Sequence, residues 1–224
     1  AKGGVYNCSV NAPVSVEMIG GTKDQSGEYY MAGVVGYASV GVENCHLNAN
    51  FAAKTTNAQG SLRFTGVVGQ VKTSPTRSVT IKNCSVAKGV KMSLEFDNIK
   101  ANYCGAIVGL GNNGVSDCVN NGEMNIKVTT PLTGTGISYI GSMVGSQQED
   151  MYDCTNNGAV TVDMNNSTSP LYAGGILGCN KKAGAAFSAC HNTANVAFVN
   201  CGNTDNVGVY VGQMVDGATA DFSA

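Results

Sequence analysis

The chain is predicted to be all-β, a right-handed parallel β-helix or β-solenoid of about six coils with a period near 36 residues. Three observations predict it: a cysteine motif that recurs six times, a glycine motif that alternates with it, and short β-branched segments bounded by Gly or Asn-Gly. Each coil is expected to contribute two or three short strands, whose equivalent side chains stack from coil to coil. Residues 1–224 are expected to form a single solenoid domain, as a segment of a longer repeat array.

Six cysteines share one sequence context and define the repeat. They are separated by 37, 39, 34, 36 and 36 residues, with an apolar residue three positions before and six positions after each of them. The six are Cys8, Cys45, Cys84, Cys118, Cys154 and Cys190. Because free cysteine behaves as a small buried hydrophobe, they are predicted to form a structural ladder in the interior. Disulfides between adjacent coils are disfavoured, since stacked side chains have parallel Cβ directions.

The residue before each ladder cysteine is predicted to turn a corner. It is polar in five coils and is Ala189 in the sixth. The five polar residues of this corner ladder are Asn7, Asn44, Asn83, Asp117 and Asp153. Asn and Asp tolerate the left-handed conformation best after Gly, so they suit such a position. A second corner is expected a few residues after each cysteine, as at Asn121-Gly122 and Asn157-Gly158.

A glycine motif alternates with the cysteine motif and is preceded by an apolar column that includes Cys104. Its copies lie at 32–36, 65–69, 105–109, 141–145, 174–178 and 212–216. Tyrosines that recur just before it are predicted to form a partly exposed aromatic ladder, which either packs against loops or stacks sugar rings. These are Tyr103, Tyr139, Tyr172 and Tyr210. The motif lacks the Gly-Lys and the following helix of a phosphate-binding loop, so no cofactor is expected.

Stretches of variable length are predicted to be loops that leave the solenoid at one corner. They are 54–63, 72–78, 94–102, 129–138 and 164–170. In solenoids, insertions of this kind gather on one face, which is often the binding face.

The composition excludes several classes of partner. Only 12% of the residues are charged and the net charge is −2, so neither a basic nucleic-acid surface nor a polybasic membrane patch is expected. No run of about 18 apolar residues is present, and no membrane insertion is expected. The low charge and the high content of Gly, Asn, Ser and Thr favour an extracellular or cell-surface location.

Asp117 and Asp153 are the best candidates for catalysis. They occupy the corner ladder in adjacent coils, and stacked strands are about 5 Å apart. That separation is close to the carboxylate spacing of a retaining glycosidase. The alternative is that Asp simply replaces Asn at a corner, because either residue suits that conformation.

The other reactive side chains do not form an obvious site. Cys179 and Cys201 lie off the ladder in one coil and are a possible disulfide. No Cys-x-x-Cys or paired histidines are present, so no metal site is expected. His46 and His191 each follow an inward cysteine and are expected to point outward, four coils apart. Lys127 and Asp163 are expected to stack as an exposed ion pair.

The pairing of the two motifs resembles the GLUG-motif repeat family. The residues that carry the resemblance are AGVVGYASVGVENCHLNANF at 32–51 and GGILGCNKKAGAAFSACHNTANV at 174–196. It extends through all six coils, although the leading Gly pair is complete only at 174–175, Ala189 replaces Asn, and Asp216 replaces the last Gly. The resemblance implies a β-helical stalk or adhesin-like region of a large surface or secreted protein. It supplies no catalytic residue.

The expected function is therefore a non-catalytic extracellular repeat module that acts as a stalk, scaffold or adhesive surface. Its expected partners are neighbouring coils of the same protein or another copy at the open ends, and a glycan or a host surface protein. The alternatives are a polysaccharide-processing β-helix that uses Asp117 and Asp153, and a filament subunit that stacks end to end.

Overall fold

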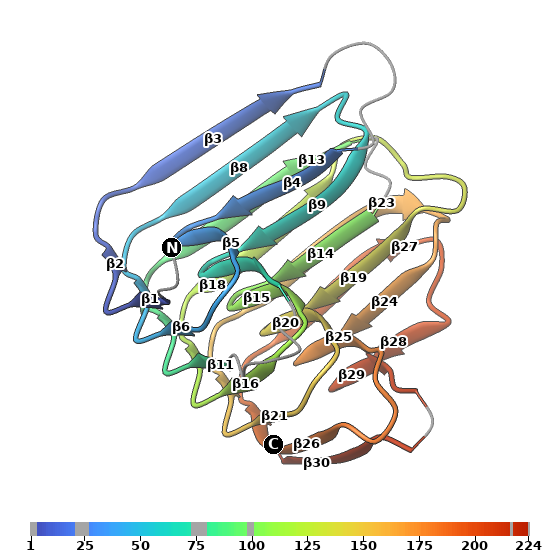
Figure 1. Cartoon of the computed structure of the whole chain (residues 1–224). Coiled ribbons are helices and arrows are strands. Elements are labelled where there is room, and N and C mark those ends of the chain that lie inside the picture. Colours follow the sequence, from blue (N-terminus) through green and yellow to red (C-terminus); the bar gives the residue numbers. More distant parts are fainter. Residues whose placement is uncertain (1–3, 21–26, 73–79, 98–100, 216, 224) are drawn as a thin grey trace.

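The structure is a computed structural model that describes residues 4–20, 27–72, 80–97, 101–215 and 217–223. Within these residues it contains strands and no helix, and neighbouring strands run parallel. The chain winds through about six coils, so that strands about 36 residues apart lie side by side (Figure 1). The predicted all-β solenoid is confirmed. The described part of the chain offers no helix that is long and apolar enough to cross a membrane.

Each coil contributes two short strands to sheet A, one on each side of the cysteine corner. The strands before the corner are β1 (Val5–Tyr6), β6 (Val42–Glu43), β11 (Thr80–Lys82), β16 (Gly114–Ser116) and β21 (Met151–Tyr152). The strands after it are β2 (Ser9–Val10), β7 (His46–Leu47), β12 (Ser85–Val86), β17 (Val119–Asn120) and β22 (Thr155–Asn156). In the sixth coil β26 (Ala186–Asn192) runs through the corner and pairs with both rows. A last strand, β30 (Thr219–Ser223), pairs with β26 and begins a further turn.

Three longer strands complete each coil, one in each of three six-stranded sheets. Sheet B contains β3 (Val14–Ile19), β8 (Phe51–Thr56), β13 (Lys91–Phe96), β18 (Glu123–Val128), β23 (Val160–Ser167) and β27 (Val196–Cys201). Sheet C contains β4 (Gly27–Ala32), β9 (Gly60–Thr65), β14 (Ala101–Gly105), β19 (Ile137–Gly141), β24 (Leu171–Gly174) and β28 (Asn206–Gly208). Sheet D contains β5 (Val35–Ala38), β10 (Val68–Val71), β15 (Val108–Gly111), β20 (Val144–Gln147), β25 (Leu177–Asn180) and β29 (Val211–Gln213).

The prediction of two or three strands per coil is wrong, because much of the sequence expected to form loops belongs to strands. Within 54–63 only residues 57–59 lie outside β8 and β9, and β23 extends to Ser167. Side chains such as Leu62 and Met164 remain buried there, which holds these segments on the core. Residues 129–136 do form a loop between β18 and β19. Of the other expected loops, 73–78 and 98–100 lie outside the described residues.

The predicted corner ladder is confirmed by the backbone. All six of its residues are left-handed, with φ of 55°, 54°, 51°, 55°, 53° and 50° for Asn7, Asn44, Asn83, Asp117, Asp153 and Ala189. Amides also link the first coils, since Asn44 Nδ2 donates to Asn7 Oδ1 at 3.0 Å and Asn83 Nδ2 donates to Asn44 Oδ1 at 2.6 Å. Ala189 has no such side chain and bears the cost of the left-handed conformation, about 1–2 kcal/mol.

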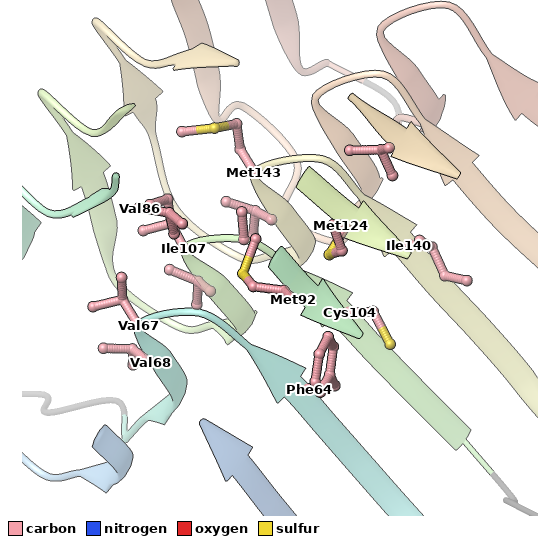
Figure 2. Close-up of a cluster of buried hydrophobic side chains, with 14 of the residues drawn as sticks. Phe64, Val67, Val68, Val86, Met92, Cys104, Ile107, Met124, Ile140 and Met143 are labelled. Carbon is pink, nitrogen blue, oxygen red and sulfur yellow. The ribbon is translucent and has the colours of Figure 1, made fainter. Parts of the chain in front are cut away.

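The core lies between sheets B and C and extends to the inner sides of sheets A and D. Figure 2 shows its central part, where side chains from stacked coils meet. The rings of Phe51 on β8 and Phe64 on β9 stack with centroids 5.4 Å apart. Cys104 lies between Phe64 and Ile140 in one column of sheet C, as predicted, and all three are fully buried.

A column of asparagines, two of them fully buried and the last, Asn192, half-buried, replaces apolar side chains in the later coils. The column begins with Val10, Leu47 and Val86 and continues with Asn120, Asn156 and Asn192. Asn120 Nδ2 donates to Asn156 Oδ1, and Asn156 Nδ2 donates to Asn192 Oδ1, both at 2.7 Å. The three amides therefore satisfy one another along the solenoid, which is the condition for burying them.

The register of the sixth coil differs from the sequence prediction. Gly208 pairs with Gly174, and Val211 pairs with Leu177. The sixth glycine motif is therefore 208–212 (Gly-Val-Tyr-Val-Gly) and not 212–216. The apolar column ends in Val207, which pairs with Ala173, rather than in Val211.

Candidate functional site

The six ladder cysteines form a continuous interior file. Five of them are buried, and Cys8 is exposed because it belongs to the first coil. Each thiol donates to the carbonyl two residues before it, across the corner, at distances from 3.1 Å for Cys118 to 3.4 Å for Cys8. Cysteine thus combines a small apolar body with a weak donor that satisfies a carbonyl at the bend. Cys118 and Cys154, in adjacent coils, are both fully buried and hydrogen-bonded to each other.

The stacked thiols shift one another's pKa in opposite directions. Hydrogen bonds with neighbouring thiols lower the pKa of Cys118 and of Cys190. Hydrogen bonds with Cys118 and Cys190, together with burial, raise the pKa of Cys154. Burial raises the pKa of Cys104 to about 12. Burial and the bonds to corner carbonyls fit a structural role for the ladder. No three His, Cys, Asp or Glu side chains of the described residues are placed to share a metal ion.

The suggested disulfide between Cys179 and Cys201 is not formed. Both are free thiols, Cys179 on β25 of sheet D and Cys201 on β27 of sheet B. Cys179 Sγ lies 3.6 Å from Gln213 Oε1, and Cys201 Sγ donates to the carbonyl of Val199 at 3.6 Å. The sequence prediction placed both residues in one coil, but Cys179 lies in the fifth coil and Cys201 in the sixth, on different sheets.

Asp117 and Asp153 occupy the corner as predicted, in adjacent coils and on the exposed side. Asp117 is held by its own neighbourhood, since Ser116 Oγ donates to its Oδ2 at 2.9 Å and Lys82 Nζ lies 3.7 Å from the same atom. Both positions therefore have the left-handed backbone of corner residues, and Asp117 also has local side-chain partners. This arrangement favours the structural interpretation of the pair.

The histidines lie in one outward column of sheet A, as expected. That column runs Ser9, His46, Ser85, Val119, Thr155 and His191. His46 Nδ1 is 2.8 Å from Ser85 Oγ in the next coil. The two rings remain four coils apart, which excludes a shared ligand.

The aromatic ladder is present on the outer face of sheet C, with a different membership. The rings of Tyr103 and Tyr139 stack at 4.9 Å, and those of Tyr139 and Tyr172 at 5.3 Å. Asn206, and not Tyr210, pairs with Tyr172 in the sixth coil. The rings stack along the solenoid axis, so both faces of the Tyr139 ring are covered by neighbouring rings. Only the edge of the ring is left for other contacts.

Arg63 continues this ladder and was missed at the sequence level. It stands between Tyr30 and Tyr103 in register, with its guanidinium carbon 5.2 Å and 5.0 Å from the two ring centroids. Its NH2 group donates to Glu28 Oε1 at 2.7 Å. Hydrogen bonding from Tyr30 and the charge of Arg63 lower the pKa of Glu28, whereas burial and the same hydrogen bond raise the pKa of Tyr30 to about 12. The group is a charge pair built into an aromatic stack, in which Arg63 Nε is buried without a hydrogen-bond partner.

A hollow of about 280 Å³ opens beside the ladder on the outer face of sheet C. Its floor comes from small residues of the second and third coils, Ser61 and Ala101, and Ile137 of the fourth coil closes one end. Tyr103 and Tyr139 form the wall, and Thr135 of the loop 129–136 stands opposite. No motif indicated this hollow, because it results from small side chains where neighbouring coils carry large ones.

Charges alternate along the outer face of sheet B. The predicted pair of Lys127 and Asp163 is in register, and it extends into a ladder of five residues. In coil order these are Glu17, Lys54, Glu95, Lys127 and Asp163. A shift by one coil at any point would bring like charges together, so the ladder favours a single stacking order.

Comparison of the chain with known proteins finds no matching family model, no matching curated protein and no matching solved structure. The geometry of the chain therefore carries the functional argument.

Proposed function

We propose that the chain is a non-catalytic structural module, a rigid stalk or scaffold in an extracellular or cell-surface protein. The observation that carries this proposal is the continuity of its stacked columns. Thiols, corner residues and apolar residues stack through all six coils, and alternating charges through the first five. Such repeats extend a structure by a fixed step of about 4.8 Å per coil. The low charge and the GLUG-like motifs support the surface location.

The ends of the module are suited to further stacking. Val14 and Val16 in the first coil are 37% and 38% exposed, whereas their partners Phe51 and Ala53 in the second coil are 0% and 5% exposed. β30 already continues sheet A beyond the sixth coil. We therefore propose that a further coil, from the same protein or another copy, covers these apolar edges, because an open strand edge is a template for pairing.

Removal of one whole coil tests the scaffold proposal. Deletion of residues 84–117 joins Asn83 to Cys118 and keeps every column in phase. We expect this variant to fold, with an unchanged β-sheet circular dichroism signal per residue, and to label with antibody on intact source cells like the parent. Lys54 then faces Lys127, at a cost below about 1 kcal/mol.

Deletion of half a coil is the matched control. Removal of residues 101–117 places β17 directly after β13 in sequence, so that no later column stays in phase. This variant is expected neither to fold nor to reach the surface. A whole-coil variant that unfolds as completely as the half-coil variant, or a parent chain that only permeabilised cells reveal, would contradict the proposal.

A further inference from the structure

We propose that the hollow on the outer face of sheet C binds one neutral sugar ring of a glycan. The site goes beyond the scaffold role and does not depend on it. Its shape follows from the register: Ser61 and Ala101 stand between Glu28 and Ile137 in one outward column. Two small side chains in succession leave a depression that spans two coils. At about 280 Å³, it is near the lower end of ligand pockets, which suits a single ring rather than a long segment.

The wall of the hollow selects oxygen-rich ligands. Tyr103 and Tyr139 stand two residues after Ala101 and Ile137 on the same face of their strands, so their rings border the depression. The ring faces are covered, since Tyr103 lies between Arg63 and Tyr139 and Tyr139 lies between Tyr103 and Tyr172. What they present is the ring edge, which carries positive partial charge and attracts oxygen lone pairs.

The other lining residues supply the hydrogen-bonding and apolar contacts that a sugar ring makes. Ser61 and Thr135 offer hydroxyls that both donate and accept, and Ala101 and Ile137 offer an apolar surface for the C–H face of a ring. Among the described residues, no charged side chain lines the hollow. Near the wall, Arg63 is paired with Glu28 at 2.7 Å. Lys181 Nζ lies over the tyrosine rings, 3.9 Å from the centroid of Tyr139 and 5.4 Å from that of Tyr103. A neutral hexose or N-acetylhexosamine fits this chemistry. An ionic ligand finds no counter-ion among the lining residues, and the ammonium of Lys181 is already engaged by the tyrosine rings.

Saturation-transfer NMR on the full chain tests the proposal with the methyl glycosides of glucose, galactose, mannose and N-acetylglucosamine, and with methyl glucuronide as the charged comparison. We expect at least one neutral glycoside to bind with a millimolar Kd, as is usual for so small a contact, and the glucuronide to bind at least tenfold more weakly. Absence of binding by every neutral glycoside, or equal binding of the glucuronide, would overturn the proposal.

Variants locate the binding. Ala101→Leu fills the hollow from a half-buried outward position, so we expect the fold to persist and the affinity to fall at least tenfold. Ala52→Leu makes the same change in an outward column of sheet B and is expected to bind like the parent. Ser61→Ala and Thr135→Ala are expected to weaken binding about three- to tenfold each through loss of one hydrogen bond. Unchanged affinity in Ala101→Leu, with circular dichroism like that of the parent, would place the sugar elsewhere and refute the site.

Discussion

Replacement of Phe64 by Ala is expected to lower the free energy of unfolding by about 3–5 kcal/mol, as for other large-to-small changes in a packed core. Phe64 is fully buried, stacks on Phe51 across the two main sheets and covers Cys104 in its own column. The stacked strands cannot close on the cavity without losing register with both neighbouring coils. Urea unfolding, followed by circular dichroism and tyrosine fluorescence, measures the change.

Phe198→Ala is the matched control for this prediction. Phe198 lies on β27 in the sixth coil and is only partly buried, because fewer strands cover it. Its replacement is expected to cost less than about 2 kcal/mol. A loss below about 1 kcal/mol for Phe64→Ala, or equal losses for the two variants, would show that the core is not packed between these sheets.

Replacement of Asn156 by Leu is expected to have an effect of similar size, about 3–5 kcal/mol, through polar groups left without partners. Asn156 is fully buried, and its amide bonds Asn120, Asn192 and the carbonyl of Gly158. An apolar side chain leaves the buried Asn120 Nδ2 and the buried Gly158 N–H without an acceptor, and the half-buried Asn192 Oδ1 without a donor. Each such buried group costs about 1–3 kcal/mol. The same urea unfolding experiment measures the loss.

Asn157, the residue after Asn156, is a control that separates the effect of burial on stability from the effect of hydrogen bonding. Asn157 is exposed and also bonds along the solenoid, to Asn121 at 2.9 Å and from Thr193 at 2.6 Å. Because water replaces these partners, Asn157→Ala is expected to cost less than about 1 kcal/mol. If Asn156→Leu were no more destabilising than Asn157→Ala, the buried asparagine file would not exist as described.

The cysteine and corner ladders were predictable because every coil repeats the same local requirement. A left-handed residue must precede a small inward side chain, and the thiol must satisfy the corner carbonyl. Two adjacent residues, the corner residue and the cysteine after it, meet that requirement. Ala189, which stands where the other coils have Asn or Asp, is also left-handed, with φ of 50°.

Other features depend on which residues pair between coils. Similarity between the repeats predicted this pairing less accurately. The motif at 212–216 resembles the glycine motif in its letters, but the strand pairing places Gly208 and Val211 in register. Tyr210 consequently leaves the aromatic ladder. Arg63 interrupts the tyrosines in sequence, and only the pairing shows that Glu28 and two rings enclose it.

The buried asparagine column was also missed, although its signal was present. Asn120 and Asn156 each stand two residues after a ladder cysteine, so the period of a strand places them on the inward side. Polar side chains suggested an exposed corner, and the Asn-Gly that follows reinforced this interpretation. Their mutual hydrogen bonds, which permit burial, form only between coils.

The distance between two exposed positions in one outward column of sheet B tests the central claim most directly, that equivalent residues of successive coils stack in register. Ser15 and Thr161 are 146 residues apart in sequence but four rungs apart through Ala52, Ser93 and Asn125. With ketone-reactive spin labels on unnatural residues at both sites, pulsed electron paramagnetic resonance should give a narrow distribution of label-to-label distances. It should be centred at about 19 Å, four steps of about 4.8 Å. A broad distribution, or one centred far from that value, would contradict the stacked solenoid.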